Sequence, residues 1–160
     1  LATAAGCQLV ATCDLAIAAE TASFATSGIN VGLFCSTPGV AVGRALPRKQ
    51  AMDLLLTGDF INAERAAEIG LINKAVAEAD LDRETEALAR KLANKSAHAL
   101  ALGKNAFYKQ LEMGVSDAYA FAGAEMARNM MDRDAAEGID AFIEKRTPEW
   151  DQGTRDGEDA

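Results

Sequence analysis

The distribution of charge along the chain is the feature that most limits how it can fold. Only Asp14 and Glu20 are charged before Arg44, although the 160 residues include 16 Lys and Arg and 24 Asp and Glu residues. A stretch with so little charge is typical of a buried interior, and a chain of this length can form one domain with a proper core. The sequence therefore predicts that the first quarter forms the interior and that the remainder is mainly helical surface.

The chain opens with small residues followed by an apolar run. Ala4, Ala5 and Gly6 allow a tight turn, and the run from Cys7 to near Asp14 predicts a buried helix. The positive end of that helix would face the turn, where uncovered N–H groups suit a developing oxyanion, such as a thioester carbonyl becoming an enolate. A tightly packed helix start without chemistry is the alternative.

Turn-forming residues divide the next part of the chain into short elements. Apolar runs and Gly, Pro and Asn positions predict a buried strand at 15–19, an extended piece at 23–25, a loop at 27–37, and helices that begin at Pro38, Pro47 and Asn62. The second of these helices should stop at Gly58 and the third at Gly70.

Beyond Leu71 apolar positions recur at helical spacing. They predict an almost wholly helical region with helices at about 79–94, 97–112, 116–131 and 134–145, and a polar, disordered tail at 151–160. Met126, Met130 and Met131 suit either a subunit contact or an ordinary core.

Composition excludes several classes of function. The net charge is −8 without a Lys or Arg cluster, which argues against nucleic acid as a partner. No apolar run is long enough for a membrane span, and no secretory signal pattern is present. The three cysteines, Cys7, Cys13 and Cys35, are odd in number and indicate free thiols in a reducing compartment, so a cytoplasmic location is expected. No Cys and His spacing suits a metal, and His98 is expected to be an ordinary surface residue.

Four blocks of sequence, in order, carry a resemblance to a known family. The chain resembles the enoyl-CoA hydratase/isomerase (crotonase) family in LATAAGCQLVATCD (1–14), FATSGINVGLFCSTPG (24–39), TGDFINAERAAEIGLI (57–72) and EGIDAFIEKR (137–146). The blocks correspond to the oxyanion-hole segment, the second active-site loop, the T-G-x-x-I-x-A signature and the C-terminal E-G-x-x-A-F-x-E-K-R block of that family. Together they cover about residues 1–150.

The resemblance implies an α/β fold of a particular kind. Residues 1–72 would be the C-terminal part of a spiral core of ββα units, and residues 73–150 a helical region for assembly into a homotrimer or homohexamer. The family's N-terminal portion has no counterpart here, so the core is incomplete. Either the chain is a fragment or it completes its core by association.

The resemblance also implies where the chemistry would lie. The backbone N–H of Ala5 would be the oxyanion donor, while Gln8 and Gly28 occupy the positions of the two hydratase glutamates. Gln8 cannot take up a proton at neutral pH and Gly28 has no side chain, which puts simple hydration in doubt. If the pocket keeps the family's geometry, restoring glutamate at both positions is expected to raise hydratase activity.

Other residues at family positions are candidates for proton transfer or binding. Cys35, Ser36 and Thr37 form a polar cluster that either faces the acyl group or caps the following helix. Phe142 and Lys145, with Arg146 adjacent, match residues that contact coenzyme A from a neighbouring subunit, although basic residues also suit a helix C-terminus.

The implied function is that of an enzyme acting on an acyl-CoA thioester by stabilising an enolate, with both usual glutamates replaced. Coenzyme A would enter as part of the substrate, with no other cofactor and no metal. A non-catalytic family member that binds acyl-CoA or only assembles is the alternative. RNA binding, known for a family member, is disfavoured by the acidic charge balance.

Overall fold

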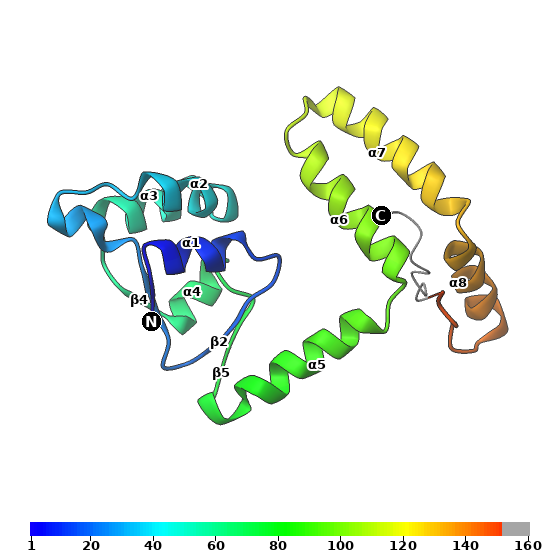
Figure 1. The fold of residues 1–160 in the computed structure, drawn as a ribbon, viewed down its shortest axis with the longest axis horizontal. Helices are drawn as coiled ribbons and strands as arrows, with labels where there is room; N and C mark the ends of the chain where they lie inside the picture. The colour runs from blue at the N-terminus through cyan, green and yellow to red at the C-terminus, as the bar shows by residue number, and fades with distance from the viewer. Residues whose placement is uncertain (152–160) are drawn as a thin grey trace, which may run out of the picture. The chain divides into compact units, whose positions relative to one another are not determined.

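The computed structural model describes residues 1–151 and contains eight α-helices, two short 3₁₀ helices and five short strands within them (Figure 1). Contacts divide the chain into two compact units, Leu1–Leu88 and Ala89–Ala160, and α5 (Leu81–Ala93) runs across this boundary. The boundary that the family resemblance implies, between a core part that ends at residue 72 and a helical part that begins at residue 73, stays a prediction. The predicted tail at 151–160 lies outside the described residues except for Asp151.

The strands of the first unit form two small sheets. In one, β1 (Ala2–Thr3) pairs in parallel with β3 (Ser23–Ala25), which pairs antiparallel with β4 (Ile61–Asn62). In the other, β2 (Ile17–Ala19) pairs in parallel with β5 (Lys74–Val76). The β5 strand was not predicted, so the chain beyond Leu71 is not almost wholly helical. A run of three residues is too short to give a periodic signal.

The helices of the first unit pack around one core. They are α1 (Ala5–Thr12), η1 (Ser27–Val31), α2 (Ser36–Ala45), α3 (Arg48–Thr57), α4 (Ala63–Glu68) and η2 (Glu78–Asp80). In Figure 1, α1 lies beside α2, which it contacts extensively. The buried core residues come from helices α1 to α4, from β3 and from the turns that follow α2 and α4: Cys7, Phe24, Val42, Leu46, Ala51, Leu54, Ala63, Ala66, Ile69, Leu71 and Ile72.

Several predicted helix ends are confirmed by their geometry. The Asn62 side chain accepts a hydrogen bond from the Arg65 N–H at 2.8 Å and caps α4. Gly58 follows α3 and Gly70 follows α4, with φ angles of 65° and 87° that an L side chain rarely adopts. The loop predicted at 27–37 begins instead with the η1 turn of 3₁₀ helix.

The first quarter of the chain is less buried than its composition predicts. Helix α1 begins at Ala5 rather than Cys7, and Cys7 is its one buried residue, whereas Leu9 is 67% exposed. Val31 and Leu33 in the next loop are also exposed. One face of α1 packs on α2 and β1, whereas the opposite face is not covered by residues 1–151. The low charge of this region therefore predicted more burial than the single chain provides.

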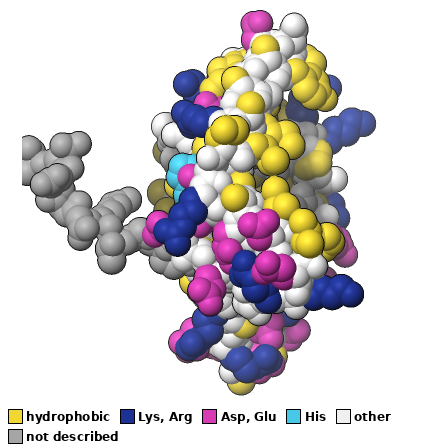
Figure 2. Space-filling view, turned by 90° about the vertical axis from the view of Figure 1, so that its right-hand side faces the viewer, with side chains coloured by type: hydrophobic (Ala, Val, Ile, Leu, Met, Phe, Trp, Pro, Cys, Tyr) yellow, Lys and Arg dark blue, Asp and Glu magenta, His cyan; other side chains and the backbone are white. Residues whose placement is uncertain are grey.

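The second unit is helical, as its periodicity predicts. It contains α6 (Ala97–Gln110), α7 (Val115–Met130) and α8 (Arg133–Glu144). Within residues 89–151, Ala141 is the only buried apolar side chain, and Met126, Met130 and Met131 are exposed rather than core. Figure 2 shows groups of apolar side chains, in yellow, on one face of the molecule.

The segment after α8 folds back along the helices of the second unit. Arg146 forms a two-pronged ion pair with Glu137, with its Nη2 donating to Oε2 at 2.9 Å. The Trp150 indole N–H donates to the Asn94 carbonyl at 2.9 Å, and the Asp151 N–H donates to Asp134 Oδ1 at 2.9 Å. This segment, residues 146–151, is called the C-terminal brace below.

Across the part of the chain that the structure describes, no helix is both long and apolar enough to cross a membrane.

Candidate active site

The turn between β1 and α1 has an unusual backbone conformation at Ala4. Its φ and ψ angles are 48° and −111°, a region that L residues rarely occupy. The Ala4 N–H donates to the Ala25 carbonyl at 3.0 Å, and the Ala4 carbonyl accepts from the Gln8 N–H at 3.0 Å. The chain thus leaves a strand and enters a helix within one residue. A strained turn of this kind often marks a functional site.

The predicted oxyanion donor lies directly after this turn. Ala5 is the first residue of α1 and is exposed, and its N–H has no hydrogen-bond acceptor among residues 1–151. No side chain caps α1 and its first turn carries no acidic residue. The first N–H groups of a helix lack partners within it and carry its positive end. The geometry is therefore compatible with the predicted role of the Ala5 N–H.

The two positions of the family glutamates have different surroundings. Gln8 is half-buried, one turn into α1. Gly28 lies in η1, where an added Cβ would be 2.5 Å from the Leu33 carbonyl oxygen and 2.8 Å from Cys35 Sγ. A Cβ essentially never lies closer than 3.0 Å to a heavy atom outside its own residue and its two chain neighbours. In this conformation, position 28 has no room for any side chain.

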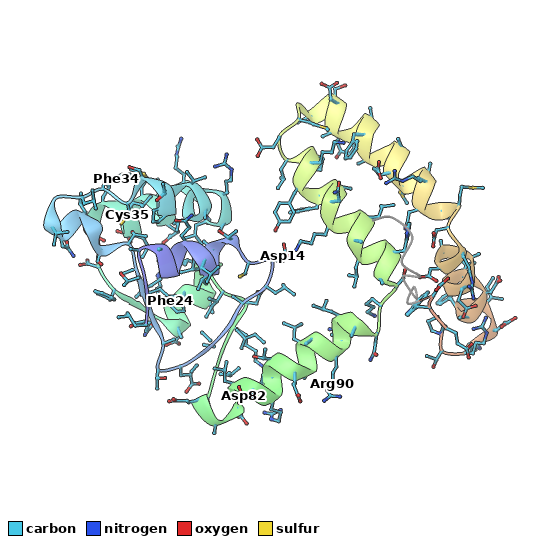
Figure 3. The ribbon with its side chains drawn as sticks, in the orientation of Figure 1. Asp14, Phe24, Phe34, Cys35, Asp82 and Arg90 are labelled. Atoms are coloured by element: carbon cyan, nitrogen blue, oxygen red, sulfur yellow. The ribbon has the colours of Figure 1, made fainter. Side chains whose placement is uncertain are left out.

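The predicted polar cluster at 35–37 is divided between interior and surface. Cys35, which is labelled in Figure 3, precedes α2 and is buried. Ser36 and Thr37 are exposed in the first turn of α2. The Ser36 hydroxyl lies 3.4 Å from the Phe34 carbonyl, to which it donates. Cys35 provides no side-chain cap for α2. Of the three, only the two hydroxyls are open to a ligand.

The second buried thiol is chemically quiet. Burial raises the pKa of the Cys7 thiol to about 11, and the nearby Cys35 adds to the rise. A thiol with so high a pKa is almost entirely protonated near neutral pH and is a poor nucleophile. Cys7 therefore serves the packing of α1 rather than catalysis.

The predicted coenzyme A contacts lie at the end of α8. Phe142 is 84% exposed, and Lys145 is exposed and ends the helix with a left-handed φ of 58°. Arg146 is held by Glu137 and Glu144. Lys145, not Arg146, is thus the basic side chain available to a ligand in this block.

Three hydroxyl residues near the site were not predicted. Thr3 Oγ1 and Ser27 Oγ are 3.0 Å apart and join the α1 turn to η1. Thr26 is fully buried and its hydroxyl donates to the Leu54 carbonyl at 2.7 Å. Short polar residues at strand ends are too common to indicate such links from sequence alone.

The described residues contain no group of three or more His, Cys, Asp or Glu side chains that could hold a metal ion.

Comparison with known proteins assigns the family. A family model described as enoyl-CoA hydratase/isomerase matches residues 1–153. The chain belongs to the enoyl-CoA hydratase/isomerase family. It is 55% identical over 150 residues to the rat enoyl-CoA hydratase domain-containing protein 3, mitochondrial, an alignment that covers 94% of this chain and 50% of the rat protein.

Solved structures of the enoyl-CoA hydratase/isomerase family confirm the crotonase-like α/β fold. A crystal structure of an enoyl-CoA hydratase from Mycobacterium smegmatis matches with a TM-score of 0.90 and 57% identity, over 93% of this chain and 58% of that chain. The crystal structure of human enoyl-CoA hydratase domain-containing protein 3 matches with a TM-score of 0.88 and 54% identity, over 93% and 59%. The chain spans about half the length of the curated family members it matches.

The expected cytoplasmic location is wrong by the same comparisons. The rat protein and the corresponding mouse and human proteins are all named as mitochondrial. Unpaired cysteines indicate a reducing compartment but do not tell one such compartment from another. The unpaired cysteines therefore supported a reducing compartment but not the choice of the cytoplasm.

Proposed function

We propose that the protein binds an acyl-CoA thioester and polarises its carbonyl through the Ala5 N–H, so that an enolate is stabilised. The observation that carries this proposal is the strained Ala4 turn, which leaves the exposed first N–H of α1 without an acceptor among residues 1–151. Membership of the enoyl-CoA hydratase/isomerase family supports a thioester as the ligand. A helix N-terminus favours a developing negative charge on that oxygen.

The reaction would not use two glutamates at the family positions. Gln8 has an amide that can orient a water molecule but cannot accept its proton. Gly28 is closely packed against the Leu33 carbonyl and Cys35 Sγ, which leaves no room for a carboxylate. Proton movement would depend on an exposed hydroxyl such as Ser36, or on bound water. We therefore propose enolate chemistry other than two-carboxylate hydration.

Assembly would complete the binding surface. The second unit has large exposed apolar side chains on α7 and α8, among them Tyr119, Met126 and Ile143. We propose that these helices associate in a homotrimer or homohexamer, in which Phe142 and Lys145 contact coenzyme A bound by a neighbouring subunit. Light scattering during size-exclusion chromatography tests the assembly. Lys145→Ala should weaken acyl-CoA binding in calorimetry while leaving the assembly unchanged.

The activity can be tested on the full-length protein with 2-enoyl-CoA and 3-enoyl-CoA thioesters of several chain lengths. Hydration, isomerisation and thioester hydrolysis are followed separately, and binding is measured by calorimetry. Hydration or isomerisation supports the proposal, because both pass through an enolate. Thioester hydrolysis alone would contradict the enolate, because it passes through a tetrahedral intermediate. Binding without turnover would favour a non-catalytic family member that binds acyl-CoA. Absence of binding would refute the proposal and favour a family member that only assembles.

The role of the Ala5 N–H can be tested at the level of one atom. Replacing Ala5 by lactic acid exchanges its N–H for an ester oxygen and keeps the methyl group. Loss of one oxyanion donor typically lowers kcat by about 100-fold to 1000-fold. Protein made by the same incorporation method with alanine at position 5 is the matched control. An ester variant with unchanged kcat would show that this N–H does not bind the oxyanion.

A further inference from the structure

The Ala4 turn needs support from its surroundings. Ala4 and Lys145 are the only residues other than glycine with a positive φ among residues 1–151. An L residue keeps such a conformation only where neighbouring groups hold it. The two hydrogen bonds of the Ala4 peptide groups, to Ala25 and from Gln8, fix its N–H and its carbonyl. With both peptide groups of Ala4 bonded, the remaining residue through which the turn can be held is Thr3, the strand residue directly before Ala4.

The Thr3 hydroxyl supplies that attachment. It lies 3.0 Å from the Ser27 hydroxyl in a half-buried position. Thr3 pairs with Ala25 in the parallel ladder, so Ser27 follows two residues after its ladder partner. The bond therefore spans from the last residue before the turn to the first residue of η1.

The η1 side of this bond is itself fixed. Thr26, directly before Ser27, donates to the Leu54 carbonyl at 2.7 Å from a fully buried position. Asn30 Nδ2 donates to the Gly58 carbonyl at 3.3 Å. These two bonds attach η1 to α3 and its C-terminal turn. Ser27 is thus an anchored point to which Thr3 can transmit a constraint.

We propose that Thr3 and Ser27 are positioning residues that hold the Ala4 turn so that the Ala5 N–H meets the thioester carbonyl. The pair touches neither substrate nor reacting atoms, and acts through the backbone between Thr3 and Ala5. This inference rests on the proposed function, because it assigns a task to residues that support the proposed oxyanion donor. Small displacements of such a donor lower catalysis because its hydrogen bond depends steeply on distance and angle.

The test compares Thr3→Val, which removes the hydroxyl and keeps the shape, with Thr3→Ser, which keeps the hydroxyl. Ser27→Ala removes the other partner. Thr21→Val is the matched control, because Thr21 is exposed and its hydroxyl bonds to Glu78 at 3.3 Å. Each full-length variant is mixed with crotonyl-CoA labelled with ¹³C at the carbonyl. The infrared shift of the bound carbonyl, kcat, KM and the melting temperature are measured.

The expected result is a loss of carbonyl polarisation with little loss of binding. Thr3→Val and Ser27→Ala should each reduce the infrared shift and lower kcat about tenfold, with KM within about twofold, because the donor is displaced rather than removed. Thr3→Ser should restore both. The variant that lacks both hydroxyls should be no worse than either single variant, because one link is lost only once. Thr21→Val should behave as the unsubstituted protein.

Two outcomes separate this inference from the proposed function. If the unsubstituted protein shows no carbonyl shift on binding, the proposed function fails. If it shows the shift and Thr3→Val and Ser27→Ala keep it while only their melting temperatures fall, the link is structural and the positioning inference fails. Where the unsubstituted protein binds without turnover, the infrared shift alone decides. If Thr3→Val does not fold, Ser27→Ala compared with Ser27→Thr decides in the same way.

Discussion

Gly28→Ala should destabilise the protein even though it adds a single methyl group. The new Cβ would lie 2.5 Å from the Leu33 carbonyl oxygen, so the backbone would have to move by about 0.5 Å to reach the 3.0 Å limit of real contacts. The Leu33 N–H donates to the Gly28 carbonyl at 3.0 Å, so this movement would also disturb a hydrogen bond that closes the loop. The Leu33 carbonyl belongs to the backbone, so it cannot move aside for the new methyl group as easily as the end of a flexible side chain could.

The magnitude follows from the cost of overpacking. Inserting a methyl group into a closely packed site typically costs about 1–3 kcal/mol of unfolding free energy. A loss of about 2 kcal/mol, with a urea m-value of about 2 kcal/mol per M, lowers the midpoint of urea unfolding by about 1 M. Far-ultraviolet circular dichroism along a urea titration measures this midpoint and the m-value together.

A matched substitution elsewhere separates packing from the general effect of alanine. Gly43 lies within α2 and an added Cβ would meet nothing within 4 Å. Gly43→Ala should raise the unfolding free energy by about 0.5–1 kcal/mol through helix propensity. An unchanged midpoint for Gly28→Ala would refute the packing argument. If it holds, replacing Gln8 and Gly28 by glutamate together should lower stability rather than raise hydratase activity, contrary to the expectation from sequence.

Three further outcomes are expected. Asn62→Ala removes the side-chain cap of α4 and should lower the unfolding free energy by about 1 kcal/mol, measured by urea unfolding, whereas Asn62→Asp should keep most of it. Hydrogen bonding to Arg146 lowers the pKa of Glu137 to about 2, so the stability that this pair contributes is complete above pH 4.5 and is lost as the pH falls toward 2. The difference in melting temperature between the protein and the Glu137→Gln variant should therefore shrink as the pH falls over that range. A difference that stays constant would contradict this prediction. Iodoacetamide at pH 8 should modify the exposed Cys13 and spare buried Cys7, as peptide mass spectrometry would show; equal labelling would contradict the burial of Cys7.

Local signals in the sequence predicted the helical elements well. The cap at Asn62 and the glycines after α3 and α4 act within one turn of chain, so their geometry follows from nearby residues. The strands were harder to predict. Of the two strands that were predicted, β3 has its predicted bounds and β2 begins at Ile17 rather than Leu15. The strands β1 and β4 were not predicted, because they are two residues long and exist through pairing with distant segments.

The candidate site was predictable in position but not in detail. The small residues at 4–6 indicated the turn, and the structure adds that Ala4 takes a positive φ. That Gly28 is enclosed by the Leu33 carbonyl and Cys35 Sγ depends on how the loop closes on itself, which no residue pattern reports. The Thr3–Ser27 bond depends on strand register and was equally hidden.

The C-terminal brace sets a practical limit on how far the protein can be shortened. A chain that stopped at Glu144, where α8 ends, would lose the Arg146–Glu137 ion pair and the Trp150 bond to Asn94. It would also leave Glu137 without the N–H that Glu149 donates at 2.7 Å. The last turn of the final helix is therefore not the natural end of this unit. Truncated versions should retain every residue through Asp151, and fusion partners should be joined beyond it.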